Sequence, residues 1–532
     1  MPALPRITLA QTKVHLGDLT ANLASIEEAI AADNGRSALL VFPSLALTGH
    51  ALLDRWLYPH VAERVEAALP TLCALSSQQA FLLGMPLTLN GKLFHSLCLF
   101  EQGELRWCYH QQVLSTDPLL DLARYFSTDP CQPWLDFQGV RIGVSIGDEI
   151  FQPGVQQQLK AAHCALVLNL GEHSFYHDSL PVHFQQLSAA AQALHCPLAQ
   201  VNLVGGQDEL VFAGYSCVFD GEGQLLQRAA GFSSERLTID PTATNPPPPL
   251  PSSEALTWQA LVTAIRDYAT ACGFNGALLG LSGGIDSALV LALAVDALGA
   301  DQVTAVMMPY HYTAQISQDD AAEQARDLGV TYHVAPIAPL VEPFAAQLQP
   351  LLAQWPAARQ DTTEQNLQAR SRGMLLMALS NRSGALLLTT SNKSEMAVGY
   401  CTLYGDMAGG FAPLKDIPKT LAYRLAEYRN TISPAIPERV ITRPPTAELA
   451  PGQADSDSLP PYPLLDEIVR LYVEENQSSE QLLAAGLDAD RVHTVTRLID
   501  RNEFKRRQAA PGPRMSKRGF GRERRIGMSS KL

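Results

Sequence analysis

The chain has 532 residues, of which 46% are hydrophobic and 17% are charged. A single hydrophobic core rarely serves so many residues, so we expect two globular domains of roughly 250 residues each. We find no apolar stretch of about 20 residues and no basic-then-apolar pattern at the N-terminus, so we predict a cytoplasmic protein with no membrane partner.

The net charge of −14 argues against broad nucleic-acid binding, so we predict no nucleic-acid partner. Positive charge is nevertheless concentrated at residues 501–532, which hold eleven Lys or Arg and two Glu. Three interpretations are open: a solvated tail, a nucleic-acid patch, or a basic lid over a phosphorylated small molecule. We favour the lid because Glu503–Gln508 adjoins a helical pattern rather than low-complexity sequence.

Nine cysteines are spread along the chain without a CxxC pair or a Cys/His cluster at zinc spacing. This usage is typical of reduced, mostly buried thiols. We therefore expect neither a zinc site nor a disulfide framework.

Short apolar runs alternate with helical stretches along the first half of the chain. The runs are Ala38–Phe42, Phe81–Gly84, Ile142–Ile146 and Ala165–Leu170, and the helical stretches include Leu19–Ala32 and Pro181–Ala193. This alternation predicts a layered α/β domain.

A proline-rich segment, Asn245–Pro251, cannot continue a helix or a central strand, so it marks a domain boundary. We predict a first domain at residues 1–245, a linker at residues 246–254 and a second domain at residues 255–532. Beyond the linker, Gly276–Leu281 and Val303–Met308 have the composition of parallel strands. Each is followed by a helical pattern, at Ser287–Leu298 and Ser317–Leu328 respectively, which predicts a doubly wound parallel sheet.

A glycine-containing loop, Ser282-Gly283-Gly284-Ile285-Asp286-Ser287, joins the first of these strands to its helix. Backbone N–H groups and the helix dipole converge on an anion at such a turn, so it predicts a phosphate site. The two serines can donate hydroxyl hydrogen bonds to phosphate, and Asp286 is explained if it holds a magnesium ion. Because no GxxxxGK[ST] string occurs, the loop is not a P-loop of the γ-phosphate-transferring type.

This SGGIDS string resembles the pyrophosphate loop of the N-type ATP pyrophosphatases, and the strings after it resemble NAD synthetases. The downstream strings are Met308–Pro309, Glu364–Arg370, Thr389–Glu395, Tyr404–Met407, Pro413–Asp416, Pro445–Leu449 and Lys505–Gln508. The resemblance implies an enzyme that adenylates the nicotinate carboxylate of deamido-NAD with ATP, expels pyrophosphate and lets ammonia displace AMP.

The resemblance also implies roles for individual residues. For ATP it implies Ser282, Gly283, Gly284, Asp286, Ser287, Thr390, Lys419 and Thr446; for deamido-NAD, Asn366, Arg370, Glu395 and Lys505; for Mg²⁺, Asp286 and Glu395. Among these, Asp286, Lys419 and Thr446 are expected to act in catalysis. Glu395 stays open between the metal and the substrate.

Residues 1–245 resemble the nitrilase-like glutaminase domain that is fused to NAD synthetases, which implies an αββα sandwich. The strings that carry this resemblance are Val41–Gly49, Arg124–Phe126, Val201–Gly206 and Phe212–Ser216. Active members use a Glu-Lys-Cys triad, and those three positions fall here on Ser44, Gln111 and Gly147. A hydroxyl, a neutral amide and a glycine do not supply a base, a cation and a nucleophile.

We therefore predict a magnesium-dependent NAD synthetase that takes free ammonia, beside an inactive nitrilase-like domain. Two alternatives remain: a glutamine-dependent enzyme with a non-standard glutaminase site, or a first domain that binds glutamine or another effector as a scaffold. Cys108 and Cys164 are interpreted as structural thiols, because neither has the elbow context of the family's nucleophile and no lysine occurs between Lys92 and Lys160. The resemblance also implies a homodimer or larger homo-oligomer, and a separate ammonia source is possible.

Overall fold

The computed structural model describes residues 4–356, 361–457 and 459–529. The chain divides into two compact units, Met1–Pro251 and Ser252–Leu532. The second unit begins with a helix, α5 (Ser253–Ala271), whose first turn is capped by the Ser252 hydroxyl accepting from the Ala255 N–H. The last residues of the predicted linker therefore belong to this helix, because the serine after the prolines can cap it.

Two six-stranded sheets form the centre of the first unit. The first has the order β14-β1-β2-β3-β4-β5 and the second the order β13-β12-β9-β8-β7-β6, while β10 and β11 form a separate pair. The strand bounds are β1 Ile7–Gln11, β2 Leu39–Val41, β3 Phe81–Leu89, β4 Lys92–Glu101, β5 Glu104–His110, β6 Trp134–Phe137, β7 Val140–Ile146, β8 Leu166–Leu170, β9 Leu198–Val201, β10 Val204–Gln207, β11 Leu210–Ala213, β12 Cys217–Phe219, β13 Leu225–Arg228 and β14 Glu235–Thr238.

Successive side chains along each strand point to opposite faces of the sheet, so the apolar side chains of this unit form three separate cores. Leu39 and Val41 on β2 pack between the sheets with Leu168 of β8, whereas Leu40 belongs to the core under the helices of the first sheet. On β8, Val167 belongs to the core under the helices of the second sheet. Because successive side chains point to opposite faces, strands buried on both faces read as continuous apolar runs.

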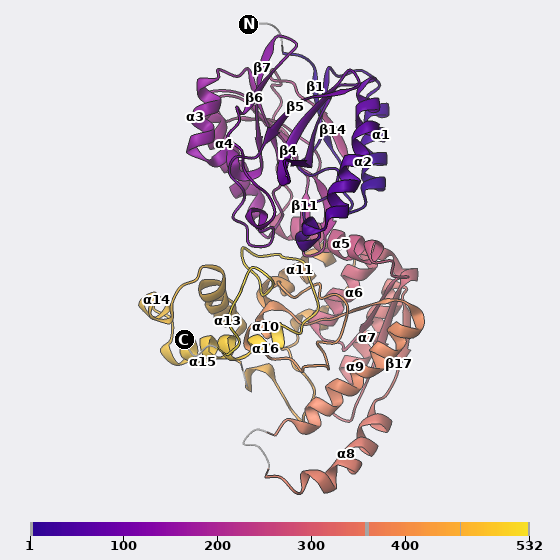
Figure 1. Cartoon of the computed structure of the whole chain (residues 1–532). Coiled ribbons are helices and arrows are strands. Elements are labelled where there is room, and N and C mark those ends of the chain that lie inside the picture. Colours follow the sequence, from indigo (N-terminus) through magenta and orange to yellow (C-terminus); the bar gives the residue numbers. More distant parts are fainter. Residues whose placement is uncertain (1–3, 357–360, 458, 530–532) are drawn as a thin grey trace. The chain divides into compact units, whose positions relative to one another are not determined.

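Four helices cover the outer faces of these sheets (Figure 1). Helices α1 (Leu19–Asp33) and α2 (Pro59–Ser76) pack on the first sheet, and α3 (Pro153–Ala161) and α4 (Ser179–Leu194) pack on the second. The predicted αββα sandwich is confirmed.

The second unit contains a four-stranded parallel sheet of order β17-β16-β15-β18. Its strands are β15 Ala277–Gly280, β16 Val303–Met307, β17 Thr331–Val334 and β18 Leu386–Leu388. Its remaining helices are α6 Ile285–Leu298, α7 Gln315–Leu328, α8 Ala338–Leu352, α9 Thr363–Ser383, α10 Lys393–Val398, α11 Lys419–Ile432, α12 Glu438–Thr442, α13 Tyr462–Val469, α14 Ser479–Ala484, α15 Ala489–Arg501 and α16 Glu503–Arg506. The predicted doubly wound parallel sheet is confirmed.

Helices lie on both faces of this sheet. Helix α6 packs against β15, β16 and α5, while α9 packs against β15 from the side where Leu376 meets Leu278 and Leu387. Parallel strands place their carboxyl ends at one edge, so the loops after β15, β16 and β18 gather there. This edge is where ligands bind in open α/β sheets.

A buried lysine fixes the C-terminal segment to the rest of the second unit. The Lys393 ammonium lies 2.9 Å from Asp416 Oδ1 and donates to Glu474 Oε1 at 2.6 Å and to Ser516 Oγ at 2.6 Å. Burial lowers the pKa of Lys393, but the two carboxylates more than compensate and hold it above its usual value.

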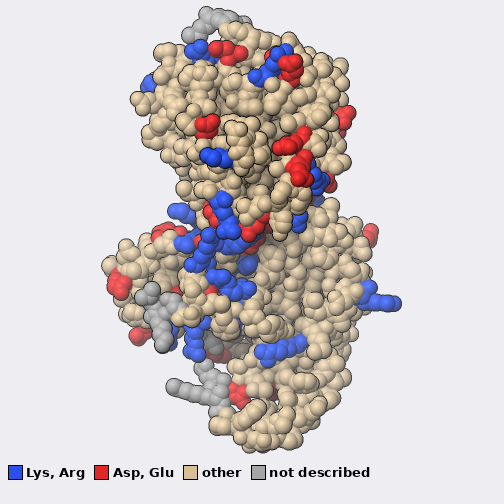
Figure 2. All heavy atoms as spheres, in the orientation of Figure 1, with Lys and Arg blue, Asp and Glu red and all other residues tan. Residues whose placement is uncertain are grey.

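Much of the visible surface in Figure 2 is uncharged, and many of the Lys and Arg side chains in the second unit surround the segment drawn yellow in Figure 1. In the C-terminal segment, Arg506, Arg507 and Arg524 all contact Glu503. Lys531 lies outside the described residues. None of the described helices is both long and apolar enough to span a bilayer.

The Lys393→Met substitution should lower the free energy of unfolding by about 3–5 kcal/mol, because it leaves Asp416 and Glu474 buried without their counter-ion. The matched control is Arg470→Met, whose partner Glu467 is about half exposed and whose loss should cost under about 1 kcal/mol. Calorimetric melting of both full-length variants checks this. Equal melting temperatures would show that Lys393 does not fix this segment.

Candidate functional site

The loop between β15 and α6 is organised by its own hydroxyl groups. Ser287 Oγ accepts from the Ser282 N–H at 3.1 Å and lies 3.0 Å from Ser282 Oγ, which in turn accepts from the Gly284 N–H at 3.2 Å. These bonds hold the turn at the N-terminus of α6, where the helix dipole favours an anion.

Gly283 is required by two features of the backbone. Its φ is +77°, and an added Cβ would lie 2.1 Å from the Ser317 carbonyl oxygen. A side chain at this position would therefore be strained and would collide with the first turn of α7.

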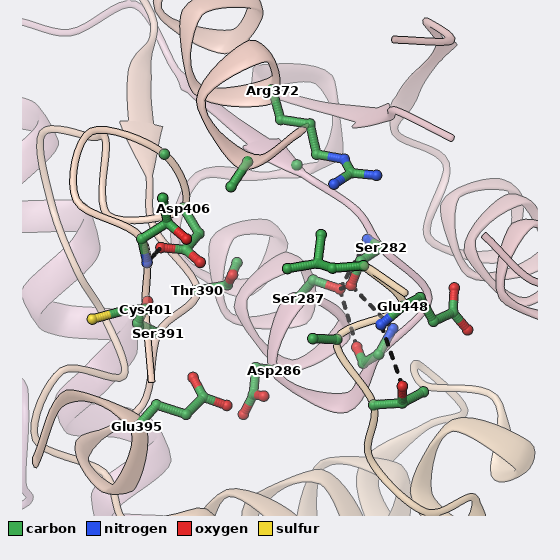
Figure 3. Close-up of a pocket in the computed structure, with 18 of the residues that line it drawn as sticks. Ser282, Asp286, Ser287, Arg372, Thr390, Ser391, Glu395, Cys401, Asp406 and Glu448 are labelled. Atoms are coloured by element: carbon green, nitrogen blue, oxygen red, sulfur yellow. Dashed lines mark hydrogen bonds between the residues drawn. The ribbon is translucent and has the colours of Figure 1, made fainter. Parts of the chain in front are cut away.

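A pocket of about 480 Å³ opens beside this loop. Figure 3 shows side chains from several separate segments facing it. Of the sequence-predicted residues, those that line it are Ser282, Gly284, Asp286, Ser287, Asn366, Thr390, Glu395, Lys419, Thr446 and Lys505.

Two carboxylates and a lysine form the charged centre of the pocket. The Lys419 ammonium lies 2.5 Å from Asp286 Oδ2 and 3.3 Å from Glu395 Oε1, and the Asn392 amide donates to Asp286 Oδ1 at 3.1 Å. Burial raises the pKa of Glu395 to about 8, with Lys419 opposing and Asp286 adding to the rise. Burial alone would lower the pKa of Lys419, but Asp286 and Glu395 raise it above its usual value.

This centre fits a hard divalent cation. The Lys419 ammonium forms ion pairs with both carboxylates. Asp286 and Glu395 therefore lie close enough together to share one positive charge. Mg²⁺ typically takes one or two carboxylates and completes its shell with substrate phosphates and water. Among the described residues no group of three or more His, Cys, Asp or Glu could hold a metal, so phosphate oxygens would have to contribute.

Arg370 does not line the pocket; it is exposed and donates to the Leu403 carbonyl at 3.2 Å. The lining residues Asn366, Ala369, Gly373 and Leu376 repeat at helical spacing on one face of α9. When Gln365, which also lines the pocket, is included, the centre of that face lies about 90° from Arg370 and about 70° from Arg372, at about 100° per residue. Arg372 lies within it and points into the pocket in Figure 3.

Arg372 is a pocket residue that the sequence did not single out. It donates to the Met308 carbonyl at 3.0 Å, and burial lowers its pKa to about 10. Helical spacing from Asn366 favours Arg370, because residues i and i+4 share a face, so local periodicity did not point to Arg372.

Glu448 was also missed as a site residue. It accepts from Ser317 Oγ at 2.6 Å and from the Ala314 N–H at 3.2 Å, so it joins the segment containing Thr446 to the start of α7. Arg443 donates to the Gly283 carbonyl at 3.0 Å and fixes the same segment to the glycine loop. No local pattern gave the partners of these two residues.

The basic C-terminal segment contributes one of its described cations to the pocket lining, Lys505. Its ammonium donates to the Gly399 and Cys401 carbonyls, each at 2.8 Å. The lid predicted for this segment thus has a single cation at the pocket in this structure, because much of the remaining positive charge pairs within the unit.

In the first unit, Ser44, His95 and Gln111 form a buried hydrogen-bonded chain. Gln111 Nε2 donates to the Ile146 carbonyl at 3.1 Å, so its Oε1 faces His95 Nδ1 at 2.8 Å. That nitrogen then carries the proton, and His95 Nε2 accepts from Ser44 Oγ at 2.7 Å. Two of the three predicted triad positions are thus linked through a histidine that the sequence analysis did not identify.

Glu172 lies where a side chain at position 147 would be. Gly147 has a φ of +55°, and an added Cβ would lie 1.9 Å from Glu172 Oε1. Glu172 is 5% exposed, and its Oε2 lies 3.8 Å from His50 Nδ1. We call Ser44, His50, His95, Gln111, Gly147 and Glu172 the buried polar cluster.

Burial dominates the electrostatics of this cluster. It lowers the pKa of His50 to about 4 and that of His95 to about 3, so both rings are neutral near pH 7. It raises the pKa of Glu172 well above its usual value, and the carboxylates of Asp148 and Glu149 add to that rise. The cluster therefore supplies no cation and no thiol at the position of Gly147.

Two family models match the chain. The model described as carbon-nitrogen hydrolase matches residues 6–241, and the model described as NAD synthase matches residues 257–509. Each match lies within one of the two compact units.

Relatives match the chain over nearly its whole length. A protein of Acinetobacter baylyi named glutamine-dependent NAD(+) synthetase is 44% identical over 98% of this chain and 97% of its own. A protein of the same name from Xanthomonas campestris is 43% identical over 98% and 96%. A solved structure of glutamine-dependent NAD+ synthetase from Acinetobacter baumannii, in complex with ADP, is 40% identical, with a TM-score of 0.79 and 98% of both chains covered. These names favour glutamine dependence, which is the alternative interpretation of the sequence, over ammonia.

The Gly147→Cys substitution should destabilise the first unit by about 1–3 kcal/mol, because the new Cβ meets the Glu172 carboxylate. The Gly147→Cys/Glu172→Ala double variant should recover most of this loss by removing that carboxylate. Differential scanning calorimetry of the two variants and of Glu172→Ala alone measures the coupling. Additive effects would contradict the overlap of the two side chains.

Proposed function

Because the chain belongs to the family of NAD synthetases in which a carbon-nitrogen hydrolase domain precedes an NAD synthase domain, we propose that it makes NAD by amidating deamido-NAD with free ammonia. We assign this chemistry to residues 255–532 and propose that residues 1–245 are catalytically inactive. A cytoplasmic location is part of the same proposal.

A carboxylate is a poor acceptor for an amine until one of its oxygens becomes a leaving group. In the proposed reaction, the nicotinate carboxylate attacks the α-phosphorus of ATP and pyrophosphate leaves. Ammonia then attacks the carboxyl carbon of the adenylate, AMP leaves, and the amide forms. The protein must neutralise a polyphosphate and hold two anions together.

The pocket supports this chemistry through its charges. We assign the loop Ser282–Ser287 to the ATP phosphates, where its N–H groups and hydroxyls can donate. Lys419, between Asp286 and Glu395, is suited to stabilise charge that develops on the leaving pyrophosphate. Mg²⁺ held by Asp286 and Glu395 would supply further neutralisation of the phosphate oxygens.

We assign Thr390 and Thr446 to ATP, and Asn366, Glu395 and Lys505 to deamido-NAD. Arg372 is an additional candidate for an anionic part of the dinucleotide, because it is cationic and lines the same pocket. Arg370 keeps its proposed substrate role only if it acts from outside this pocket, since its side chain lies on the exposed side of α9.

The observation that carries the proposal of ammonia is the overlap at Gly147. The nucleophile position has no side chain, and Glu172 fills the space that one would need. A thiol or hydroxyl is required to attack the amide of glutamine.

A second candidate function is glutamine-dependent synthesis with Ser44 as a non-standard nucleophile. The names of the relatives favour glutamine. In addition, Ser44, His95 and Gln111 have the order of nucleophile, base and orienting group. Two features oppose this candidate: Ser44 is fully buried, and the low pKa of His95 makes it a weak base.

The test measures NAD formation from deamido-NAD and Mg-ATP, with either ammonium or ammonia-free glutamine. We expect activity with ammonium, rising towards alkaline pH as more of it is unprotonated, and none with glutamine; Ser44→Ala should match the wild type. Lys419→Met should reduce the ammonium-dependent rate by about 10²–10³-fold. Activity with glutamine that Ser44→Ala abolishes would reject the ammonia proposal and support the second candidate.

We also propose that the protein is a homodimer or larger homo-oligomer assembled through the second unit. Helices α8 and α9 pack together and expose several large apolar side chains, among them Phe344, Trp355 just after α8, and Met374. Trp355 is 72% exposed and Met374 75%, and such patches mark interaction surfaces.

Met374→Asp should shift the protein towards the monomer in sedimentation-velocity runs, because a carboxylate in an apolar interface is costly. Val182→Asp on α4 is the control, since Val182 is also exposed but belongs to the first unit. A wild-type protein that sediments as a monomer at all concentrations tested would reject the proposed oligomer.

A further inference from the structure

Two cysteines face each other on adjacent strands of the first unit, apart from the pocket and from the buried polar cluster. Cys98 on β4 and Cys108 on β5 are direct antiparallel partners, and their Sγ atoms lie 3.5 Å apart. Residues in such register have Cα atoms about 4.5 or 5.5 Å apart. Both distances fall in the range that a disulfide spans, roughly 4.4–6.8 Å.

The two thiols differ in access. Cys98 is fully buried, whereas Cys108 is partly exposed and lines a cavity of about 430 Å³. The cavity lies between α2 and strands β3 to β5, with mainly apolar walls that include Trp56, Val65 and Leu87. A small reagent that enters the cavity therefore meets the sulfur of Cys108 first.

The surroundings also shift the pKa values of the two thiols in opposite directions. Burial raises the pKa of Cys98 well above its usual value, and the hydrogen bond between the two sulfurs lowers the pKa of Cys108. The accessible sulfur is thus the one that ionises more easily, and the thiolate is the nucleophilic form. Cys98 remains a thiol beside it.

We propose that Cys98 and Cys108 are a modification site: a hydroperoxide converts this pair reversibly to a disulfide, with Cys108 reacting first. The Cys108 thiolate attacks one peroxide oxygen, the O–O bond breaks, and hydroxide leaves, so that Cys108 becomes a sulfenic acid. The Cys98 sulfur then attacks the Cys108 sulfur; the S–S bond forms, the S–O bond breaks and water leaves with the Cys98 proton. One hydrogen peroxide is reduced to two waters as two thiols are oxidised to one disulfide.

The sequence between the two cysteines makes the bond easy to detect. Trypsin cleaves after Lys92, Arg106 and Arg124, which places the two thiols on separate peptides, 93–106 and 107–124. Reduced full-length protein is treated with one equivalent of hydrogen peroxide, blocked with an alkylating reagent, digested and analysed by mass spectrometry. We expect the two peptides to be linked, with the loss of two hydrogen atoms, and to separate again with dithiothreitol.

Two variants test the order of the steps. In Cys98→Ala, Cys108 should accumulate as a sulfenic acid that dimedone traps; in Cys108→Ala, the thiol of Cys98 should stay reduced. Cys272, which is exposed, is the internal reference in every digest. Oxidation of Cys272 while both peptides stay reduced in the wild type would overturn the proposal. So would sulfenic acid on Cys98 in Cys108→Ala. If either variant fails to fold, the linked peptide in the wild type still decides whether the bond forms.

Discussion

The ion cluster of Asp286, Lys419 and Glu395 is the interaction on which the arrangement of the second unit's pocket depends. It joins the start of α6, the start of α11 and helix α10, which are far apart in the sequence. Unpaired charges at this depth would be costly, so the three elements are held where their charges meet. The same balance of charge suits the pocket to a polyphosphate and its cation.

In the first unit, burial favours the uncharged forms of the titratable side chains in the buried polar cluster. In the polar cluster around Gly147, Ser44, His95 and Gln111 are linked in one chain, whereas the ring nitrogens of His50 and the carboxylate oxygens of Glu172 are buried without a hydrogen-bond partner among the described residues. Burial keeps both histidines neutral near pH 7 and raises the pKa of Glu172. The sandwich keeps the fold that the carbon-nitrogen hydrolase model describes, while its centre is occupied by the chain's own side chains. The fold alone therefore does not establish an activity for this domain.

Local patterns predicted the elements well and their contacts poorly. The apolar runs at Ile142–Ile146 and Ala165–Leu170 correspond to β7 and β8 within two residues, because strands buried on both faces have a strong compositional signal. Helix α5 begins inside the predicted linker because Ser252 caps its first turn. In the pocket, the i, i+4 spacing from Asn366 favours Arg370 rather than Arg372, and the contact of Glu448 with Ser317 joins residues that no spacing rule connects.

The sequence by itself determined the two α/β domains, the glycine loop at the N-terminus of α6, and the family to which the chain belongs. It also led to the prediction that Ser44, Gln111 and Gly147 stand at the three triad positions, because an alignment of short strings compares residue types directly. The tertiary structure decided that Glu172 fills the space beside Gly147, that His95 joins Ser44 to Gln111, and that Cys98 faces Cys108. These facts depend on strand register and on packing between segments distant in sequence, where a displacement of one residue exchanges the two faces of a strand.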